Sequence, residues 1–333
     1  EKHNILHNKQ FGFRKGYSTT HALIELTDKI AKAFEKKHIV ISLFLDLSKA
    51  FDCIDHSILL KKLKYYGIRG NAIQWFESYL CNRKQYVSVD NFNSEHKSIS
   101  VGVPQGSNLG PLLFLLYIND LQYVSNILSV ILFADDTSLF LSGKDPVALN
   151  NLLNSEMKSI QTWFTANKLY INRDKTCYMI FKSRNCRIQD NVINIKLNDL
   201  SIKKETSTKF LGVIIDENLN WKEHVNYIAL KISKSIGVFN ILKHILPLKI
   251  LTNLYNCMIL SHFMYSNIVW GGCSFYLSQK LFLLQKRAIR AITKSNYLAH
   301  TQQLFKKLKI LNIFDINKLQ LASFMFSYSK QLL

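Results

Sequence analysis

The sequence predicts an α+β protein with an antiparallel sheet, continued by a mostly helical C-terminal region. Two apolar runs, 38–47 and 131–140, are rich in β-branched and aromatic residues, as buried strands are. The Lys-rich segment 222–249 instead carries an apolar stripe near helical spacing. Both apolar runs contain acidic residues. Because a buried carboxylate is costly without a partner, these acids are the first candidate functional positions.

Asp135 and Asp136 stand side by side in the second run. In a straight strand they would point to opposite faces, whereas a tight hairpin turn at the pair would place both carboxylates at its tip, between Phe133 and Leu139. An ordinary surface turn is the simpler alternative. A second acid in the same setting, Asp46 at the end of the first run, favours function.

If the strand and the hairpin are neighbours in one sheet, Asp46, Asp135 and Asp136 converge. Three carboxylates at one place repel one another unless hard divalent cations neutralise them. Two Mg²⁺ ions roughly 3.5–4 Å apart can deprotonate an attacking hydroxyl and stabilise a leaving oxygen. The pattern therefore indicates polymerase or nuclease chemistry.

The amino-acid composition limits the kinds of binding partner that are expected. The 333 residues can form two or three subdomains, and 43 Lys and Arg against 23 Asp and Glu give a net charge of +20. This excess fits a nucleic-acid backbone, with an anionic membrane surface as the competing partner. There is no apolar run of 18 residues and no signal peptide, so neither a spanning nor a secreted protein is expected.

Six cysteines are scattered without CxxC spacing. They predict reduced thiols of an intracellular protein, in the nucleus or cytoplasm, rather than a zinc site or a disulfide framework. They are Cys53, Cys81, Cys177, Cys186, Cys257 and Cys273.

The chain opens with a glycine-punctuated segment, 10–20, before a helix expected over 21–34 with Thr19 or Thr20 as its cap. Arg14 and Lys15 either lie in an ordinary loop or contact phosphate. Since the first residue is Glu1 and no strand precedes the segment, we expect a fragment.

Helices are expected over 55–66 and 71–80, separated by Gly67 and Gly70, followed by a hairpin of strands 84–89 and 97–101. Phe51 lies between the first strand and these helices. The simpler interpretation of Phe51 is an aromatic residue of the hydrophobic core.

The segment 101–111 holds three glycines and two prolines and opens an apolar helix toward Asn119 and Asp120. Such a loop has a fixed backbone that a ligand can approach closely, so a template or nucleotide contact is expected here. Further along, the pattern predicts an amphipathic helix over 145–168 and strands over three ranges, 176–182, 191–197 and 209–215.

Several short blocks occur in a fixed order over about 170 residues. They are 46–52, 102–107 with 109–111, 133–136, Trp163 with Asn167 and Leu169, Asn172 with 175–176, and 210–212. In order and spacing they resemble a reverse transcriptase, and in detail the non-LTR (LINE-type) retrotransposon branch. The resemblance implies a right-hand polymerase palm that copies an RNA template by adding dNTPs to a DNA primer.

The resemblance also implies roles for single residues. Asp46 and Asp135 would bind two Mg²⁺ ions, with Asp136 completing the acidic group. Phe51 would stack under the deoxyribose and exclude a 2′-hydroxyl.

Nucleotide binding would extend to Gln105 and Gly106, which would contact the incoming nucleotide and the template, and to Arg14. Lys175 is a candidate general acid for the pyrophosphate. The turn 210–212 (Phe210, Leu211, Gly212) would grip the primer end, and basic residues of the C-terminal region would bind the duplex: Lys231, Lys234, Lys243, Lys286, Arg287 and Arg290.

The expected domains are partial fingers at 1–37, a palm with inserted fingers elements at 38–216, and a helical thumb at 217–333. Two residues depart from the family pattern: Phe133 replaces a tyrosine, and Asn108 replaces an aliphatic residue. The upstream fingers signature and the endonuclease domain of many relatives are not found in these residues. Two alternatives stay open: an inactive RNA-binding remnant of such an element, and a viral RNA-dependent RNA polymerase.

Overall fold

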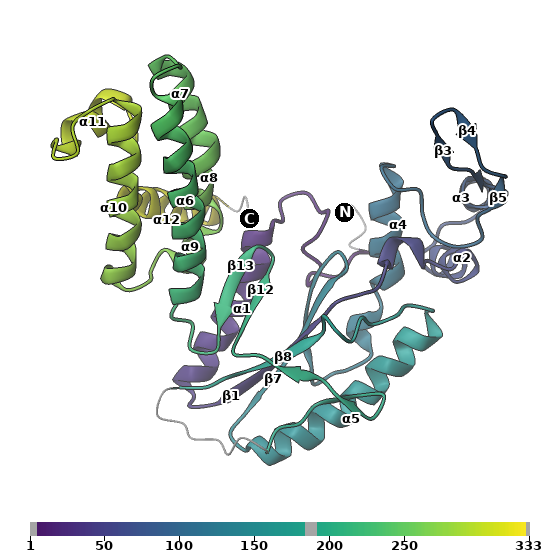
Figure 1. The fold of residues 1–333 in the computed structure, drawn as a ribbon. Coiled ribbons are helices and arrows are strands. Elements are labelled where there is room, and N and C mark those ends of the chain that lie inside the picture. The colour runs from purple at the N-terminus through teal and green to yellow at the C-terminus, as the bar shows by residue number, and fades with distance from the viewer. Residues whose placement is uncertain (1–4, 184–191, 331–333) are drawn as a thin grey trace. The chain divides into compact units, whose positions relative to one another are not determined.

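The computed structural model describes residues 5–183 and 192–330, and Cys186 lies outside them. The chain forms two compact units, here called unit 1 (Glu1–Glu205) and unit 2 (Thr206–Leu333) (Figure 1). The predicted boundary between palm and thumb falls eleven residues later, after 216. The assignment of fingers, palm and thumb stays a prediction.

Unit 1 contains a five-stranded sheet in the order β11-β8-β1-β7-β6. All neighbouring strands are antiparallel except β11 and β8, so the predicted α+β class with an antiparallel sheet is confirmed. The strands are β1 (Ile39–Leu45), β6 (Ser129–Phe133), β7 (Asp136–Gly143), β8 (Cys177–Phe181) and β11 (Lys203–Lys204). Every residue of β1 is buried, because β1 is central and both faces of the sheet are covered.

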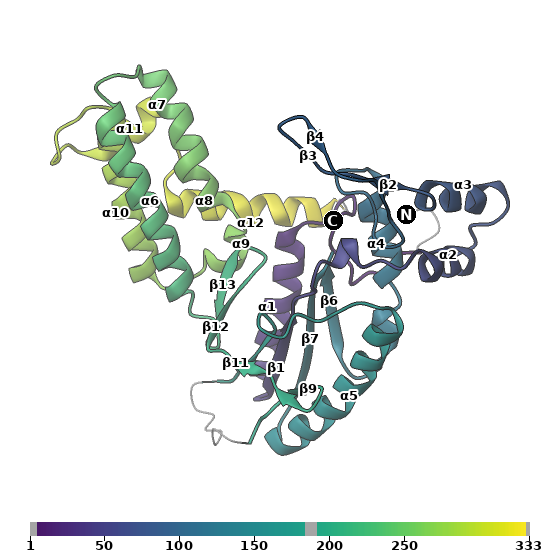
Figure 2. The same cartoon turned by 45° about the vertical axis from the view of Figure 1, so that its right-hand side comes forward.

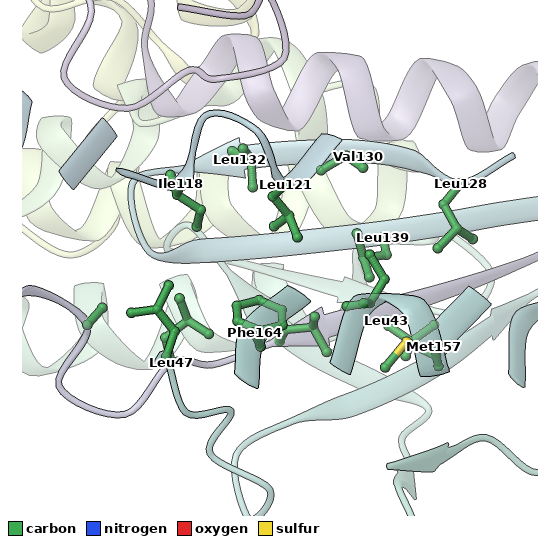
Figure 3. Close-up of a cluster of buried hydrophobic side chains, with 14 of the residues drawn as sticks. Leu43, Leu47, Ile118, Leu121, Leu128, Val130, Leu132, Leu139, Met157 and Phe164 are labelled. Carbon is green, nitrogen blue, oxygen red and sulfur yellow. The ribbon is translucent and has the colours of Figure 1, made fainter. Parts of the chain in front are cut away.

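Helix α1 (Thr19–Glu35) packs on β1 and β6 from one face. On the other face, Leu43 and Leu139 point toward Met157 and Phe164 of α5 (Pro146–Ala166) (Figure 3). The same cluster includes α4 (Leu109–Ile118), whose apolar side chains face all directions and are mostly buried. This core therefore joins the sheet to the helix that follows the glycine-rich loop.

The remaining elements of unit 1 largely follow the sequence pattern. The predicted hairpin is confirmed only as short pairs, β2 (Lys84–Gln85) with β5 (Lys97–Ser98) and β3 (Ser88–Val89) with β4 (Phe92–Asn93). Its residues are exposed, so no core extends the strands. The other elements are η1 (Ala50–Asp52), α2 (His56–Tyr65), α3 (Asn71–Leu80), η2 (Leu121–Tyr123), β9 (Lys196–Leu197) and β10 (Leu200–Ser201).

One helix cap and one strand differ from expectation. Ser18, not Thr19 or Thr20, caps α1, since its Oγ accepts the His21 N–H. Asp55 caps α2 by accepting the Ile58 N–H. Of the strand expected over 191–197, only the end is β9, and Asn191 lies outside the described residues.

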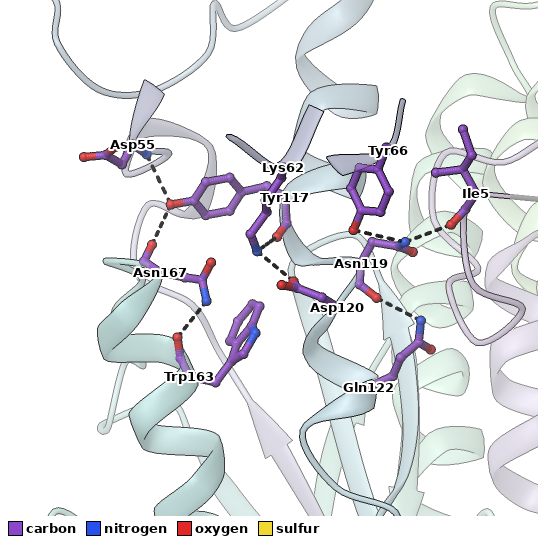
Figure 4. Close-up of polar contacts among 10 residues, drawn as sticks. All are labelled: Ile5, Asp55, Lys62, Tyr66, Tyr117, Asn119, Asp120, Gln122, Trp163 and Asn167. Carbon is purple, nitrogen blue, oxygen red and sulfur yellow. Dashed lines mark hydrogen bonds and ion pairs between the residues drawn. The ribbon is translucent and has the colours of Figure 1, made fainter. Parts of the chain in front are cut away.

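A polar network fastens the C-terminal end of α4 to α2 and α5 (Figure 4). The Tyr117 hydroxyl donates to the Asn167 carbonyl at 2.6 Å and accepts the Asp55 N–H at 3.4 Å. The Lys62 ammonium donates to the Tyr117 carbonyl and to Asp120, at 2.5 and 2.7 Å. Since buried polar groups are costly without partners, this pairing specifies how the three helices meet.

Unit 2 begins with a hairpin and continues as helices (Figure 2). The strand expected over 209–215 is wrong as one piece: β12 (Ser207–Phe210) and β13 (Val213–Asp216) pair across a turn at Leu211 and Gly212. The helices are α6 (Lys222–Leu242), α7 (Leu248–Tyr255), η3 (Asn256–Leu260), α8 (Ser261–Met264), α9 (Asn267–Trp270), α10 (Phe275–Ile292), α11 (Thr301–Leu308) and α12 (Ile313–Ser329). Helices α6 and α10 pack against each other. Across the described residues, no helix is both long and apolar enough to cross a membrane.

A buried histidine joins the hairpin to α6. His224 is 3% exposed, its Nδ1 accepts the Ile214 N–H at 3.2 Å, and its ring meets Trp270 edge to face. Burial lowers the pKa of His224 to about 4. The neutral ring is therefore the form that belongs to the folded state.

This depressed pKa predicts acid sensitivity of unit 2. An unfolded histidine gains its proton near pH 6.5, so the folded state loses stability as pH falls from 6.5 toward 4, by about 2–3 kcal/mol at pH 4.5. Denaturant unfolding at pH 7.5 and 4.5 measures this loss. His224→Gln should remove most of it, whereas His244→Gln, at an exposed position of α6's C-terminal side, should not. Equal pH dependence in all three proteins would contradict the assignment.

Candidate functional site

The acidic pair lies at the hairpin between β6 and β7, but the turn is one residue earlier than predicted. Phe133 pairs with Asp136, so the two turn residues are Ala134 and Asp135, and Asp136 is the first residue of β7. Leu139 pairs with Val130 and does not flank the turn. Ala134 has φ 55°, a conformation that is strained for alanine and persists only where its surroundings hold it.

Asp46 directly follows β1, as the sequence predicted. Leu45 pairs with Thr137, so the antiparallel register continues to place Asp46 opposite Asp136. The Asp46 N–H donates to the Thr176 hydroxyl at 3.3 Å, and its carbonyl accepts the Asn172 N–H at 2.8 Å. Strand pairing thus brings together three acids that are far apart in sequence; Asp46, Asp135 and Asp136 are called the acidic cluster below.

The pKa shifts of Asp135 and Asp136 agree with this proximity. Lost hydration, then the charges of Asp135 and Asp46, raise the pKa of Asp136 to about 6 even though its side chain is exposed. Lost hydration and the charge of Asp46 also raise the pKa of Asp135. Lys175 Nζ forms an ion pair with Asp46 at 3.7 Å. The three carboxylates therefore lie within electrostatic reach of one another, with Lys175 beside them.

Carboxylate oxygens are the ligands that Mg²⁺ prefers, and mutual repulsion favours a bound dication. The donor chemistry of the acidic cluster fits such an ion. As arranged in residues 5–183 and 192–330, no three His, Cys, Asp or Glu side chains are grouped closely enough to hold one metal ion. Metal binding by these residues stays a prediction.

A residue that the sequence did not single out supports the acidic turn. Gln10 is 1% exposed, and its Oε1 accepts the Gly12 N–H at 2.8 Å and the Ala134 N–H at 3.1 Å. Backbone hydrogen bonds from Phe11 to Leu132 and from Leu132 to Lys9 align the segment with β6. A Cβ on Gly12 would lie 2.4 Å from the Ala134 nitrogen. This close fit holds the strained turn; in the sequence, only Gly12 in the glycine-punctuated segment 10–20 hinted at it.

Phe51 lies in η1 and is partly buried. Its ring is 4.6 Å from Phe114 and meets Phe13 edge to face at 6.5 Å. The loop 102–107 is hydrogen-bonded to the same turn, because the Val103 N–H donates to the Phe51 carbonyl and the Gly102 N–H to the Ile54 carbonyl. Phe51 and the glycine-rich loop are therefore positioned together.

The other predicted nucleotide-binding residues differ in their solvent exposure and in their hydrogen bonds within the protein. Gln105 is exposed and donates to Asp52 at 2.8 Å, and Gly106 is exposed beside it. Lys175 is 69% exposed. Arg14 instead donates to the carbonyls of His7 and Gln10 and stacks on Tyr17 at 4.3 Å. Arg14 thus braces the segment that holds the acidic turn, and a phosphate contact for it stays a prediction.

In unit 2, the predicted primer-gripping residues form the tip of a hairpin. Leu211 and Gly212 have φ 44° and 80°, as a two-residue turn with positive φ at both positions requires. The Tyr265 hydroxyl donates to the Leu211 carbonyl at 2.7 Å. Phe210, just before the turn, is buried.

The basic candidates of unit 2 do not share one face. Lys231 and Lys234 line one cleft on α6 with His262, whereas Lys243, at the end of α6, is nine residues from Lys234 and turned about half a revolution away. It contacts Asn240.

On α10, Lys286 lies over Phe282, and Arg290 donates to the Ala299 carbonyl. Arg287 is exposed.

The family model described as reverse transcriptase (RNA-dependent DNA polymerase) matches residues 1–215. An RNA-directed DNA polymerase from mobile element jockey of Drosophila melanogaster is 27% identical over 92% of this chain and 34% of its own length. A Pol polyprotein from type-1 retrotransposable element R1 of Bradysia coprophila is 28% identical over 68% of this chain and 22% of its own. The resemblance seen in the sequence is confirmed.

The chain spans about a third of the length of the first of these relatives. A solved structure of apo telomerase from Candida tropicalis is 12% identical, covers 86% of this chain and 50% of its own, and superposes with a TM-score of 0.46.

The proximity of the three carboxylates in the acidic cluster can be tested without an activity assay. Asp46→Asn removes one negative charge, so the pKa of Asp135 and of Asp136 should both fall toward the ordinary aspartate range. Carboxyl-detected NMR titration measures both values. Asp28→Asn, which removes an exposed acid paired with Lys32 on α1, should leave them unchanged. Unaltered values in Asp46→Asn would show that β1 and the turn do not bring the carboxylates together.

Proposed function

Because this chain belongs to the reverse transcriptase (RNA-dependent DNA polymerase) family, we propose that it performs RNA-templated DNA synthesis as part of a non-LTR retrotransposon. It adds dNTPs to the 3′-hydroxyl of a primer. The acidic cluster, formed where β1 ends and the β6–β7 hairpin turns, is the observation that carries this proposal. The chain's basic excess supports a nucleic-acid partner.

In this proposal Asp46 and Asp135 hold two Mg²⁺ ions, and Asp136 completes the acidic cluster. Ions bound there would lower the pKa of the attacking hydroxyl and neutralise charge that develops on the leaving oxygen. The chain itself supplies rigidity: Gln10 and Gly12 hold the turn that carries Asp135, and pairing of β1 with β7 fixes Asp46. Preorganised charge of this kind is usually the largest single contribution to the rate enhancement of an enzyme.

Phe51 would select the sugar. Its ring rests on buried Phe114, so it is backed by the core and resists displacement. A 2′-hydroxyl would have to occupy the volume of the ring. Gln105 and Gly106, on the loop bonded to the same turn, would contact the nucleotide and the template, and Arg14 would contact the nucleotide phosphates.

Proton transfer to the leaving pyrophosphate is assigned to Lys175, whose exposed ammonium lies beside Asp46. The turn of Phe210, Leu211 and Gly212 would grip the primer end. The basic residues of α6 and α10 would contact duplex phosphates, which contribute affinity without reading sequence.

Two other functions make different predictions. An inactive remnant would bind RNA and not extend a primer, and a viral RNA-dependent RNA polymerase would prefer rNTPs. Primer extension on poly(rA)/oligo(dT) with Mg²⁺ and either dTTP or rUTP separates all three. Extension with dTTP supports the proposal, and extension only with rUTP, or none, contradicts it.

The acidic cluster generates the first prediction of activity. Asp135→Asn should lower extension by about 10³-fold, the scale of losing a key electrostatic stabiliser. Affinity for primer–template, measured by fluorescence anisotropy, should change little because no basic residue is altered. Asp28→Asn is the matched control at an exposed acid of α1. Wild-type rates in Asp135→Asn would remove this residue from the site.

Phe51→Ala should raise the use of rNTPs relative to dNTPs, because the volume that excludes the 2′-hydroxyl is gone. The variant also loses packing against Phe114, so a cost of about 2–4 kcal/mol in unfolding free energy is expected. The ratio of kcat/KM for dTTP and rUTP is the measurement. Phe13→Ala removes the neighbouring, 63% exposed ring as a control. An unchanged ratio would make Phe51 an ordinary core aromatic.

A further inference from the structure

Helix α3 carries a pair of stacked rings, exposed Trp75 and partly buried Tyr79, that the roles above leave unused. Trp75 and Tyr79 are one helical turn apart, and their rings are parallel within 10° with centroids 5.5 Å apart. The guanidinium of Arg83 lies over the Tyr79 ring at 5.6 Å. Trp75 is 53% exposed. These three residues are called the aromatic ladder.

The aromatic ladder leads into a basic cleft. A cavity of about 720 Å³ is lined by Arg83 itself, by Lys49 and Lys84, and by the loop that ends at Gln105. The lining has three cations and one acid, Asp52, which accepts a hydrogen bond from Gln105. The other acid near the ladder, Glu77, is two positions from Trp75 and Tyr79, and therefore on another side of α3.

Stacked aromatic rings beside a positively charged groove are the combination that binds unpaired bases and their phosphates. A folded protein surface that docked on this face would not need the cations that follow it. Arg83 belongs to both the ladder and the cleft, and Gln105 belongs to both the cleft and the predicted nucleotide site. The path is therefore continuous from Trp75 to the loop.

We propose that the aromatic ladder and this cleft bind single-stranded nucleic acid, namely the unpaired template ahead of the position of nucleotide addition. This inference rests on the proposed function for the direction of the strand. The binding itself depends only on stacking and charge. A base stacks on the exposed ring of Trp75, which Tyr79 backs, and Arg83, Lys84 and Lys49 face the phosphates.

The test compares two primer–templates in the absence of dNTPs: one blunt, one with an eight-nucleotide 5′ template overhang of uridines. The double variant Trp75→Ala/Tyr79→Ala should bind the overhang substrate about tenfold or more weakly, given roughly 1–3 kcal/mol per stacked base. Its affinity for the blunt duplex should equal that of the unaltered protein. Tyr65→Ala, which removes an 87% exposed ring from α2, is the matched control and should behave like the unaltered protein.

Trp75→Phe keeps a flat ring and should retain most of the overhang affinity. A second overhang made of deoxyuridines tests whether the site requires RNA. If the ladder stacks unpaired bases in general, the double variant should lose affinity for both overhangs. Equal overhang binding by the double variant and the unaltered protein would overturn the inference, as would an equal loss in Tyr65→Ala. These binding measurements involve no catalysis. They therefore test the inference even if the protein fails to extend a primer.

Discussion

The pairing of β1 with β7 is the constraint on which the site depends. It is antiparallel, with Leu45 opposite Thr137, and that register alone brings Asp46 to the acidic turn. A shift by one residue would turn every side chain of β1 to the other face of the sheet. The odd-numbered residues of β1 pack in the apolar core on one face of the sheet, so such a shift would put Ser42 and its even-numbered neighbours in their place. Hydrophobic burial thus sets the register, and the register sets the chemistry.

The turn itself is unfavourable by local criteria. It holds an alanine at positive φ, and it gathers carboxylates whose pKa values are raised by lost hydration and by one another. The surroundings hold the turn in this conformation, because Gln10 accepts the Ala134 N–H and Gly12 lies against the same nitrogen. Strain and repulsion held in place by a rigid frame are typical of functional sites.

The glycine-rich loop is likewise held in place by its surroundings. Its backbone is bonded to η1, and the helix that it opens is anchored by the network of Tyr117, Lys62 and Asp120. Phe51 therefore has support on two sides, from the loop and from Phe114. The basic side chains, in contrast, are divided between clefts and braces, as Lys231 and Arg290 show. Net charge alone thus indicates a polyanionic partner, but not which lysines and arginines contact it.

The sequence by itself determined the class of fold, the buried strands, most helices and the acidic residues, because apolar periodicity and misplaced charge are local properties of the chain. It also determined the family, through the order of short blocks. The tertiary structure alone decided that the turn lies at Ala134 and Asp135, that Gln10 supports it, and that Arg14 is used as a brace. Each of these depends on hydrogen bonds or close contacts between residues whose partners the local pattern does not identify. Gln10 and Ala134 are 124 positions apart, and only the packed sheet brings them together.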